Sequence, residues 1–233
     1  MPTTTYEKRR GQLLTYFDKT AVVAWERLTS EAPLGRIRQS VRAGRNQMRD
    51  TLLQWLPGDL KGLRLLDAGC GTGALSVEAA RRGAEVIAVD LSPTLVELAQ
   101  QRAPNDLGDG SIEFHAGDML EMDFGTVDYV VAMDSLIHYP ATDVVATLAT
   151  LAGRTESALL FTFAPSTPAL RLMHGLGRLF PSANRAPAIE PTTEAELYRR
   201  LADRSGLENW QVGRSYRVAS GFYTSQVMEL VRR

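Results

Sequence analysis

The segment from Leu65 to Asp90 constrains the fold of this chain more than any other part of the sequence. An apolar run ends at Asp67, a loop with three glycines at alternate positions follows, and a second apolar run ends at Asp90. This order predicts a strand, a tight loop, a helix and a second strand. Glycine allows positive φ and close approach of the backbone to a ligand, and the first turn of a helix presents free N–H groups. The segment therefore predicts a nucleotide-type binding site in an α/β domain.

The spacing of the glycines separates two kinds of ligand. A dinucleotide loop reads G-x-G-x-x-G, which gives a pyrophosphate room at the helix N-terminus. Here the third glycine comes one residue early, and the carboxylate of Asp67 precedes the loop. That carboxylate disfavours an anionic pyrophosphate and favours a ligand with a cationic end. A nicotinamide dehydrogenase and a non-catalytic nucleotide-binding protein remain as alternatives.

The run Asp67-Ala-Gly-Cys-Gly-Thr-Gly73 resembles motif I of class I S-adenosylmethionine-dependent methyltransferases. The resemblance implies a Rossmann-like, seven-stranded, mostly parallel sheet that ends in an antiparallel hairpin, with S-adenosylmethionine as co-substrate. It places Asp67 near the methionine moiety, Asp90 on the ribose hydroxyls and Asp118 on the adenine amino group. The cofactor-binding residues expected on this basis are Asp67, Gly69, Gly71, Gly73, Asp90, Leu91, Asp118, Met119 and Met133.

Composition narrows the class of protein. The length of 233 residues and the 44% hydrophobic content predict one α/β domain with embellishments. A net charge of −1 disfavours a nucleic-acid substrate. The single cysteine, Cys70, precludes an internal disulfide, and without an apolar run of about 18 residues we expect a cytoplasmic protein, although contact with a membrane surface stays open. No set of His, Cys and acidic residues has metal-ligand spacing, so no protein-bound metal is expected.

The order of predicted elements follows a doubly wound sheet with additions. Residues 1–5 read as a loose leader, and helical periodicity then predicts one helix or two over 7–27 and another from Ile37 to Trp55. Strands are expected at 64–68, 86–89, 112–116, 127–132, 158–163, 210–218 and 222–231. Helices are expected at 74–82, 93–102, 143–153 and 194–205. We interpret 1–58 as a helical substrate-binding extension, 59–233 as the cofactor-binding core and 164–191 as an inserted cap.

Arginines dominate the polar face of the helix that begins near Ile37. Between Pro33 and Leu56 the only acid is Asp50, whereas arginine stands at positions 36, 38, 42, 45 and 49. Such a run is often a solvated face. As a cluster, however, it suits a carboxylate-bearing ligand, because a planar guanidinium pairs with carboxylate at two points.

Five stretches outside the glycine loop resemble the magnesium-protoporphyrin IX O-methyltransferases of chlorophyll and bacteriochlorophyll biosynthesis. They are Tyr16-Phe-Asp-Lys-Thr-Ala21, Trp25-Glu-Arg-Leu-Thr-Ser30, Arg36-Ile-Arg38, Val41-Arg-Ala-Gly-Arg45 and Leu136-Ile-His-Tyr-Pro140. The resemblance implies esterification of one propionate of Mg-protoporphyrin IX, with magnesium present only in the substrate. It also suggests the porphyrin-binding subunit of magnesium chelatase as a partner and peripheral contact with the photosynthetic membrane. A methyltransferase of another organic acid or of a quinone precursor is the nearest alternative.

The residues expected to act on the acceptor lie in these stretches. A propionate is already ionised at pH 7, so its methylation needs no general base. We expect His138 and Tyr16 to orient the acceptor, against the alternatives of a loop histidine bonded to backbone and a tyrosine packed beside Phe17. The substrate-binding residues expected are Arg38, Arg42, Arg45, Trp25 and Tyr139.

Overall fold

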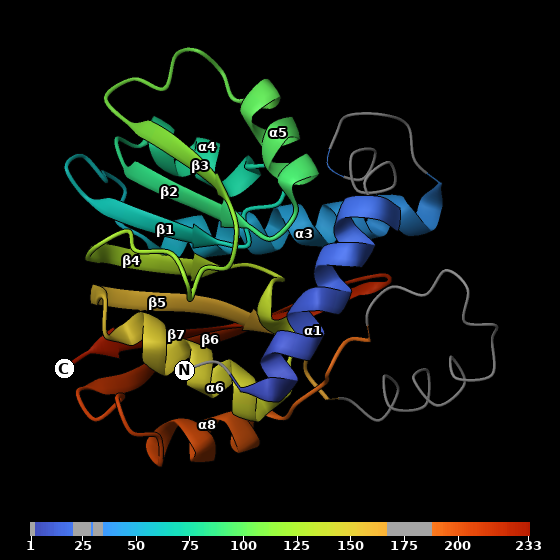
Figure 1. The fold of residues 1–233 in the computed structure, drawn as a ribbon, viewed down its shortest axis with the longest axis vertical. Helices are drawn as coiled ribbons and strands as arrows, with labels where there is room; N and C mark the ends of the chain where they lie inside the picture. Colours follow the sequence, from blue (N-terminus) through green and yellow to red (C-terminus); the bar gives the residue numbers. More distant parts are fainter. Residues whose placement is uncertain (1–2, 21–28, 30–34, 167–187) are drawn as a thin grey trace.

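The computed structural model describes residues 3–20, 29, 35–166 and 188–233, and its centre is a single twisted sheet (Figure 1). The strand order is β3-β2-β1-β4-β5-β7-β6. The strands are β1 (Arg64–Ala68), β2 (Glu85–Asp90), β3 (Ser111–Ala116), β4 (Val127–Ala132), β5 (Thr155–Phe163), β6 (Trp210–Ser220) and β7 (Tyr223–Arg232). The first five strands are parallel, and β7 runs antiparallel to both β5 and β6. The predicted mostly parallel sheet with a terminal antiparallel hairpin is confirmed.

Helices cover both faces of the sheet (Figure 1). They are α1 (Thr4–Thr15), which continues into a π-helical turn η1 (Tyr16–Thr20), α3 (Arg36–Trp55), α4 (Ala74–Arg81), α5 (Pro93–Arg102), the 3-10 turn η2 (Leu136–His138), α6 (Ala141–Ala152) and α8 (Glu194–Ala202). Because strand side chains alternate in direction, neighbouring residues enter two separate cores. Leu65 packs with α3 and α4, whereas Leu66 packs with α1, α6 and α8.

Local sequence signals account for the elements that carry the cofactor loop. Ser92 caps α5 by accepting a hydrogen bond from the N–H of Leu95 at 3.3 Å, and Pro93 takes the first helical position. Both features were predicted. Among the boundaries that were wrong, α6 begins two residues earlier than predicted, at Ala141, and β5 begins three residues earlier, at Thr155. Helix α8 ends at Ala202, three residues before the predicted end.

The N-terminus is more ordered than the sequence predicted. Residues 3–5 were expected to be a loose leader, but α1 begins at Thr4 and the Thr3 hydroxyl accepts a hydrogen bond from the N–H of Tyr6 at 3.1 Å. Thr3 also donates to Asp143 in α6 at 2.8 Å. This cap and this tertiary contact are the reasons the prediction failed. Figure 1 shows α1 lying across the end of the sheet at which the parallel strands finish.

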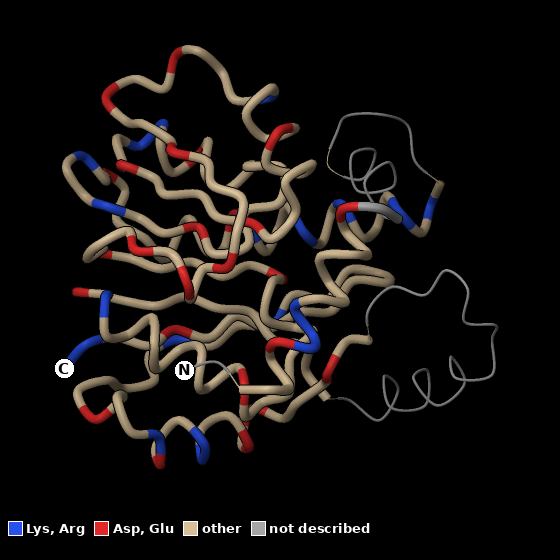
Figure 2. The backbone as a smooth tube through the Cα atoms, in the orientation of Figure 1, with Lys and Arg blue, Asp and Glu red and all other residues tan. Residues whose placement is uncertain are grey.

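The two regions expected to cover the acceptor, the extension at 1–58 and the cap at 164–191, are described only in part. In the extension, residues 1–2, 21–28 and 30–34 lie outside the described residues, and in the cap residues 167–187 do. Its two ends leave the core side by side, because Ser166 N–H donates to Thr192 at 2.8 Å and Thr192 N–H donates to Ala164 at 3.0 Å. The arginines at the start of α3 form the basic region seen in Figure 2 near the same end of the sheet.

Candidate functional site

The glycine loop between β1 and α4 has the backbone that its sequence requires. Gly69, Gly71 and Gly73 have φ values of 93°, 55° and 77°. A Cβ at Gly69 would stand 2.3 Å from the Cβ of Ser135, and one at Gly73 would stand 3.1 Å from the ring of Phe114. These two glycines are therefore required by packing within the protein itself, in addition to any approach of a ligand.

Asp90 joins the end of β2 to this loop. Its carboxylate accepts the N–H of Gly71 at 2.9 Å and the N–H of Ser92 at 2.9 Å. Burial raises the pKa of Asp90, and the hydrogen bonds from Ser92, Gly71 and Leu91 act in the opposite direction. The carboxylate is thus held by backbone donors of its own strand end and of the glycine loop.

Asp67 is enclosed behind the loop. The residue is 1% exposed, and its carboxylate accepts a hydrogen bond from the Ser76 hydroxyl of α4 at 2.6 Å. Burial raises the pKa of Asp67 to about 7, and the nearby charge of Asp90 raises it further. A positive ligand group close to this carboxyl would restore its ionised form.

Asp118, which follows β3, is held by the N-terminal helix. Its carboxylate accepts the Tyr6 hydroxyl at 2.8 Å, the Arg10 guanidinium at 2.7 Å and the N–H of Leu120 at 2.9 Å. Burial, followed by the charges of Tyr139 and Asp118, raises the pKa of Tyr6 far above its usual range. Because a carboxylate offers about four acceptor positions, one remains at Asp118 for a further donor.

The other predicted cofactor and ring-binding residues lie beside these carboxylates. Met119 is buried in the core that contains Tyr6, Leu91 packs against that core, and Met133 packs against the core on the other face. Tyr139 is 3% exposed and stacks on Tyr6 with ring centroids 4.8 Å apart. Tyr139, expected to bind substrate, is therefore enclosed between η2 and α1.

The ring of Phe17 contacts both residues expected to act on the acceptor. The ring of Phe17 meets Tyr16 edge to face at 5.2 Å and His138 at 6.0 Å. His138 is 8% exposed, and its Nδ1 lies 3.4 Å from the carbonyl oxygen of Ala188. Burial raises the pKa of Tyr16. The structure thus brings η1, η2 and the end of the predicted cap at Ala188 together around the ring of Phe17.

The predicted arginines divide into an exposed and an enclosed group. Arg38 is exposed and Arg42 is half-buried, whereas Arg45 pairs with Asp134 at 2.6 Å. Asp134 was not among the predicted site residues, although its position in the loop that follows β4 was a usable signal. Trp25, also expected to bind substrate, lies outside the described residues.

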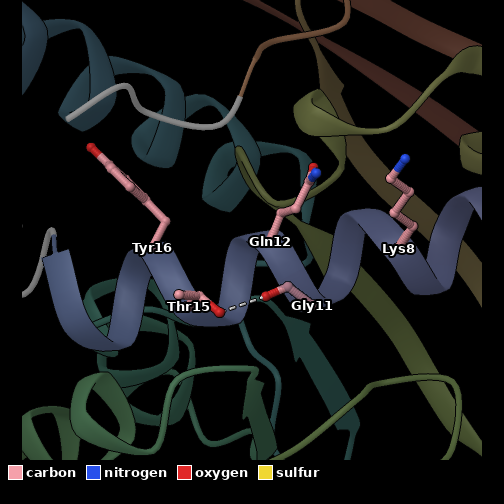
Figure 3. Close-up of a pocket in the computed structure, with 5 residues that line it drawn as sticks. All are labelled: Lys8, Gly11, Gln12, Thr15 and Tyr16. Atoms are coloured by element: carbon pink, nitrogen blue, oxygen red, sulfur yellow. Dashed lines mark hydrogen bonds between the residues drawn. The ribbon is translucent and has the colours of Figure 1, made fainter. Parts of the chain in front are cut away.

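An open cavity of about 490 Å³ lies along α1 and is lined by Lys8, Gly11, Gln12, Thr15 and Tyr16. Figure 3 shows the side chains of Lys8, Gln12 and Tyr16 projecting from the same side of the helix. Successive helical residues turn by about 100°, so Lys8 and Thr15 face away from the buried Tyr6 and Leu13. The cavity and the carboxylate of Asp118 therefore lie on different sides of α1.

Comparisons with known proteins agree with this architecture. A family model described as "Magnesium-protoporphyrin IX methyltransferase C-terminus" matches residues 132–232, and one described as "Methyltransferase domain" matches 65–156. The magnesium-protoporphyrin O-methyltransferase of Rhodobacter capsulatus is 46% identical over 96% of this chain and 97% of that enzyme. The chain belongs to the magnesium-protoporphyrin O-methyltransferase family.

A crystal structure from this family has the same fold. Magnesium protoporphyrin IX methyltransferase from Synechocystis PCC 6803 with bound SAH is 31% identical, covers 96% of this chain and 100% of that chain, and gives a TM-score of 0.83. By contrast, a ubiquinone biosynthesis O-methyltransferase of Methylocella silvestris is 38% identical over only 36% of this chain. The likeness to the magnesium-protoporphyrin family therefore extends well beyond a shared core.

Two further observations concern the described residues of this family member. They contain no group of three or more His, Cys, Asp or Glu side chains that could hold a metal ion. No helix among them is long and apolar enough to span a bilayer.

Proposed function

We propose that this chain is an S-adenosylmethionine-dependent carboxyl O-methyltransferase that converts Mg-protoporphyrin IX to its monomethyl ester in (bacterio)chlorophyll biosynthesis. The observation that carries this proposal is the extent of the likeness. Similarity to the Rhodobacter capsulatus enzyme runs through 96% of the chain, whereas similarity to the Methylocella silvestris quinone-pathway enzyme covers 36%. Cofactor motifs are shared between acceptors, so elements outside the core have to distinguish them.

The residues around the glycine loop suit the co-substrate. S-adenosylmethionine supplies a methyl group on a cationic sulfonium. Gly69, Gly71 and Gly73 would bring the backbone close to it, and Asp90 would accept hydrogen bonds from the ribose hydroxyls. Leu91, Met119 and Met133 would line the same site. Buried Asp67 favours a cationic neighbour, and the remaining acceptor position of Asp118 fits an adenine amino group.

The acceptor side needs positioning more than proton transfer. A propionate has a pKa of about 4 to 5 and is ionised at neutral pH, so its oxygen is already a nucleophile. The protein has to bring that oxygen within about 3 to 3.5 Å of the methyl carbon and remove water from the anion. We assign this task to the extension at residues 1–58 and the cap at 164–191, acting with the core at 59–233.

Guanidinium groups at the start of α3 are our candidates for the propionates. Arg38 and Arg42 would anchor carboxylates, with Trp25 flanking the ring and Tyr139, stacked on Tyr6, supporting the site from within the core. Arg45, on the same helix, would add a positive charge beside the propionate while it keeps its pair with Asp134.

We assign His138 and Tyr16 to orientation of the reacting carboxylate. His138→Ala should lower kcat with little change in the Kd of S-adenosylhomocysteine, and Tyr16→Phe should do the same more weakly. Normal turnover by His138→Ala would remove this role. If the kinetics of Tyr16→Phe were unaltered, the hydroxyl would have no role and the Tyr16 ring would serve only to pack against Phe17.

The direct test is a mass-spectrometric assay of the purified chain with S-adenosylmethionine and Mg-protoporphyrin IX. A product heavier by one methylene, formed only with both substrates, is the expected result. Methyl transfer to a quinone precursor or to another organic acid, with none to the porphyrin, would overturn the proposal and support the nearest alternative. Binding of S-adenosylmethionine without transfer to any of these acceptors would indicate a non-catalytic protein.

We further propose delivery of the poorly soluble substrate by the porphyrin-binding subunit of magnesium chelatase, at or near a membrane. Ile37 and Phe222 are 57% and 65% exposed, and Phe222 N–H donates to Ser40 beside Ile37 at 3.3 Å. Exposed Arg36 and Arg38 flank them, a combination suited to anionic lipid. Co-sedimentation with phosphatidylglycerol vesicles that is lost in an Ile37→Ser, Phe222→Ser variant would support the contact. Equal sedimentation of both proteins would refute it.

A further inference from the structure

Asp134 has an unusual backbone at a sensitive position. It is the one non-glycine residue in the described part of the chain with positive φ, at 54°. It is the second residue after β4, in the loop that leads through Ser135 to His138. Left-handed backbone is unfavourable for a residue with a Cβ and persists where the surroundings hold it, often at functional sites. The contacts of its side chain therefore have to stabilise this conformation.

Those contacts gather three elements on one carboxylate. The side chain of Asp134 is 4% exposed and accepts Arg45 of α3 at 2.6 Å, the Tyr223 hydroxyl of β7 at 3.1 Å and the Ser225 hydroxyl of β7 at 3.1 Å. Its own N–H donates to the Thr162 hydroxyl of β5 at 2.7 Å. We call these five residues the Asp134 cluster. Charge-assisted hydrogen bonds of this kind are the strong ones.

Helix α3 is fitted to the cluster by a glycine. A Cβ at Gly44 would stand 2.5 Å from the Tyr223 ring, so only glycine lets that ring lie against the helix. The next residue, Arg45, reaches the same carboxylate that the Tyr223 hydroxyl contacts. Gly44 thus allows α3 to pack against Tyr223 of β7, and Arg45 fixes the position of the helix by its pair with Asp134.

The same loop is also fastened to the cofactor side. The Ser135 hydroxyl donates to the carbonyl oxygen of Ala68 at 2.7 Å, immediately before Gly69. The consecutive residues Asp134 and Ser135 therefore connect α3 to the glycine loop, since Asp134 pairs with Arg45 and Ser135 bonds the residue before Gly69. His138 follows in η2 at the end of this connection.

We propose that Asp134 is a positioning residue, which holds the loop from Met133 to Pro140 in register between α3 and the glycine loop. Through this loop it sets the place of His138 and of the acceptor carboxylate relative to the methyl donor. The inference rests on the proposed function, because the reaction it positions is that methyl transfer. On this inference, Asp134 and its partner Arg45 affect the rate of methyl transfer as well as the stability of the fold.

Asp134→Asn is the decisive variant, because it keeps the shape and removes the charge that Arg45 and Tyr223 address. A displacement of about 1 Å at a reacting centre costs on the order of a hundredfold in rate, so we expect a loss of roughly that size in kcat with Mg-protoporphyrin IX. The Kd of S-adenosylhomocysteine should stay close to that of the wild type. Amide hydrogen exchange within residues 133–140 should become faster.

Glu229→Gln is the matched control. Glu229 is a buried acid on the same strand β7 as Tyr223, and it pairs with Arg214 away from the glycine loop. Its loss should lower the melting temperature comparably while kcat and exchange at 133–140 stay unchanged. Arg45→Lys, which keeps the positive charge, should recover part of the kcat that Arg45→Met loses.

The outcomes separate this inference from the proposed function. Wild-type protein that forms no ester would refute the proposed function, whereas the exchange measurement would still test the loop. Asp134→Asn with wild-type kcat and unchanged exchange would overturn the positioning role. A lowered melting temperature with kcat intact well below it would do the same, because a merely structural residue behaves in that way.

Discussion

Asp90 ends β2 and Asp118 lies two residues beyond the end of the neighbouring strand β3, yet the two carboxylates are held in different ways. Asp90 accepts two backbone N–H groups, both from residues within 20 positions of it. Asp118 accepts Tyr6 and Arg10, which lie more than 100 positions away on α1. The Asp90 side of the predicted cofactor site is thus built from contiguous sequence, whereas its Asp118 side, next to α1, depends on tertiary packing.

This difference teaches where each half is vulnerable. Changes in the glycine loop should affect binding of the co-substrate whatever α1 does. Changes in α1 should act first on the stability of the molecule and only then on the site, since Tyr6 and Leu13 are part of the main core. The following variants test that separation, beginning with the largest expected effect.

Gly69→Ala should be the most damaging single change. Its φ of 93° disfavours any side chain, and the new Cβ would lie 2.3 Å from Ser135. Left-handed strain and overpacking each cost on the order of 1–3 kcal/mol, so we expect a loss of about 3 kcal/mol or more in the free energy of unfolding. Urea unfolding and titration with S-adenosylhomocysteine would measure the two consequences, and affinity should fall steeply.

Gly62→Ala is the control for that variant. Gly62 has a similar φ of 73°, but a Cβ there meets nothing within 4 Å. Only the backbone strain remains, so the cost should be about 1–2 kcal/mol and affinity should not change. Equal effects of the two substitutions would show that the contact with Ser135 does not constrain the loop.

Tyr6→Phe tests the half of the site that depends on α1. The change removes the hydroxyl that reaches Asp118 at 2.8 Å in a buried position. A hydrogen bond to a charged group contributes about 1.5–3 kcal/mol, so urea unfolding should show a loss within that range. Affinity for S-adenosylhomocysteine should fall less than in Gly69→Ala.

Tyr198→Phe provides the comparison, because Tyr198 is 40% exposed on α8. Its effect should be within about 0.5 kcal/mol, as for most surface substitutions. If Tyr6→Phe were equally mild, Asp118 would not depend on α1.

The same division explains what the sequence could predict. Strands, caps and glycines from Arg64 to Ala132 follow from local periodicity and turn chemistry, and β1 and β4 were predicted to the residue. The engagement of Asp118 by Tyr6 and the choice of Arg45 as the partner of Asp134 depend on which helix faces meet in space. No local signal carries that information, since Arg38, Arg42 and Arg45 look alike along the chain.

Asp67→Asn should change how stability depends on pH. The folded-state pKa of Asp67 is about 7, above the value of about 3.9 expected in the unfolded chain. Its stabilising contribution is therefore complete below about pH 4 and is lost as pH rises through 7. Relative to the wild type, Asp67→Asn should gain stability from about pH 4 to about pH 7, by up to about 1.4 kcal/mol per pH unit, and the difference should level off above pH 7, where the carboxyl is ionised in both states.

Saturating S-adenosylmethionine should reduce this difference. A cationic ligand near the carboxyl favours its ionised form and lowers the pKa. Urea unfolding at pH 5, 6, 7 and 8, with and without the ligand, would measure both effects. Parallel pH profiles for the two proteins would mean that Asp67 is ionised throughout this range.

Gly11→Ala should have the smallest effect and the opposite sign. Gly11 lies inside α1, and a Cβ there meets nothing within 4 Å. Alanine in a helix interior is about 0.5–1 kcal/mol more favourable than glycine, so the free energy of unfolding should rise by that amount. Gly44→Ala, in α3, should instead destabilise the protein, because its Cβ would collide with Tyr223.

Gly11 also lines the open cavity on the outer side of α1. A stabilised Gly11→Ala protein with a raised KM for Mg-protoporphyrin IX would therefore show that the macrocycle extends along that side of α1, whereas unchanged kinetics would show that it does not reach Gly11.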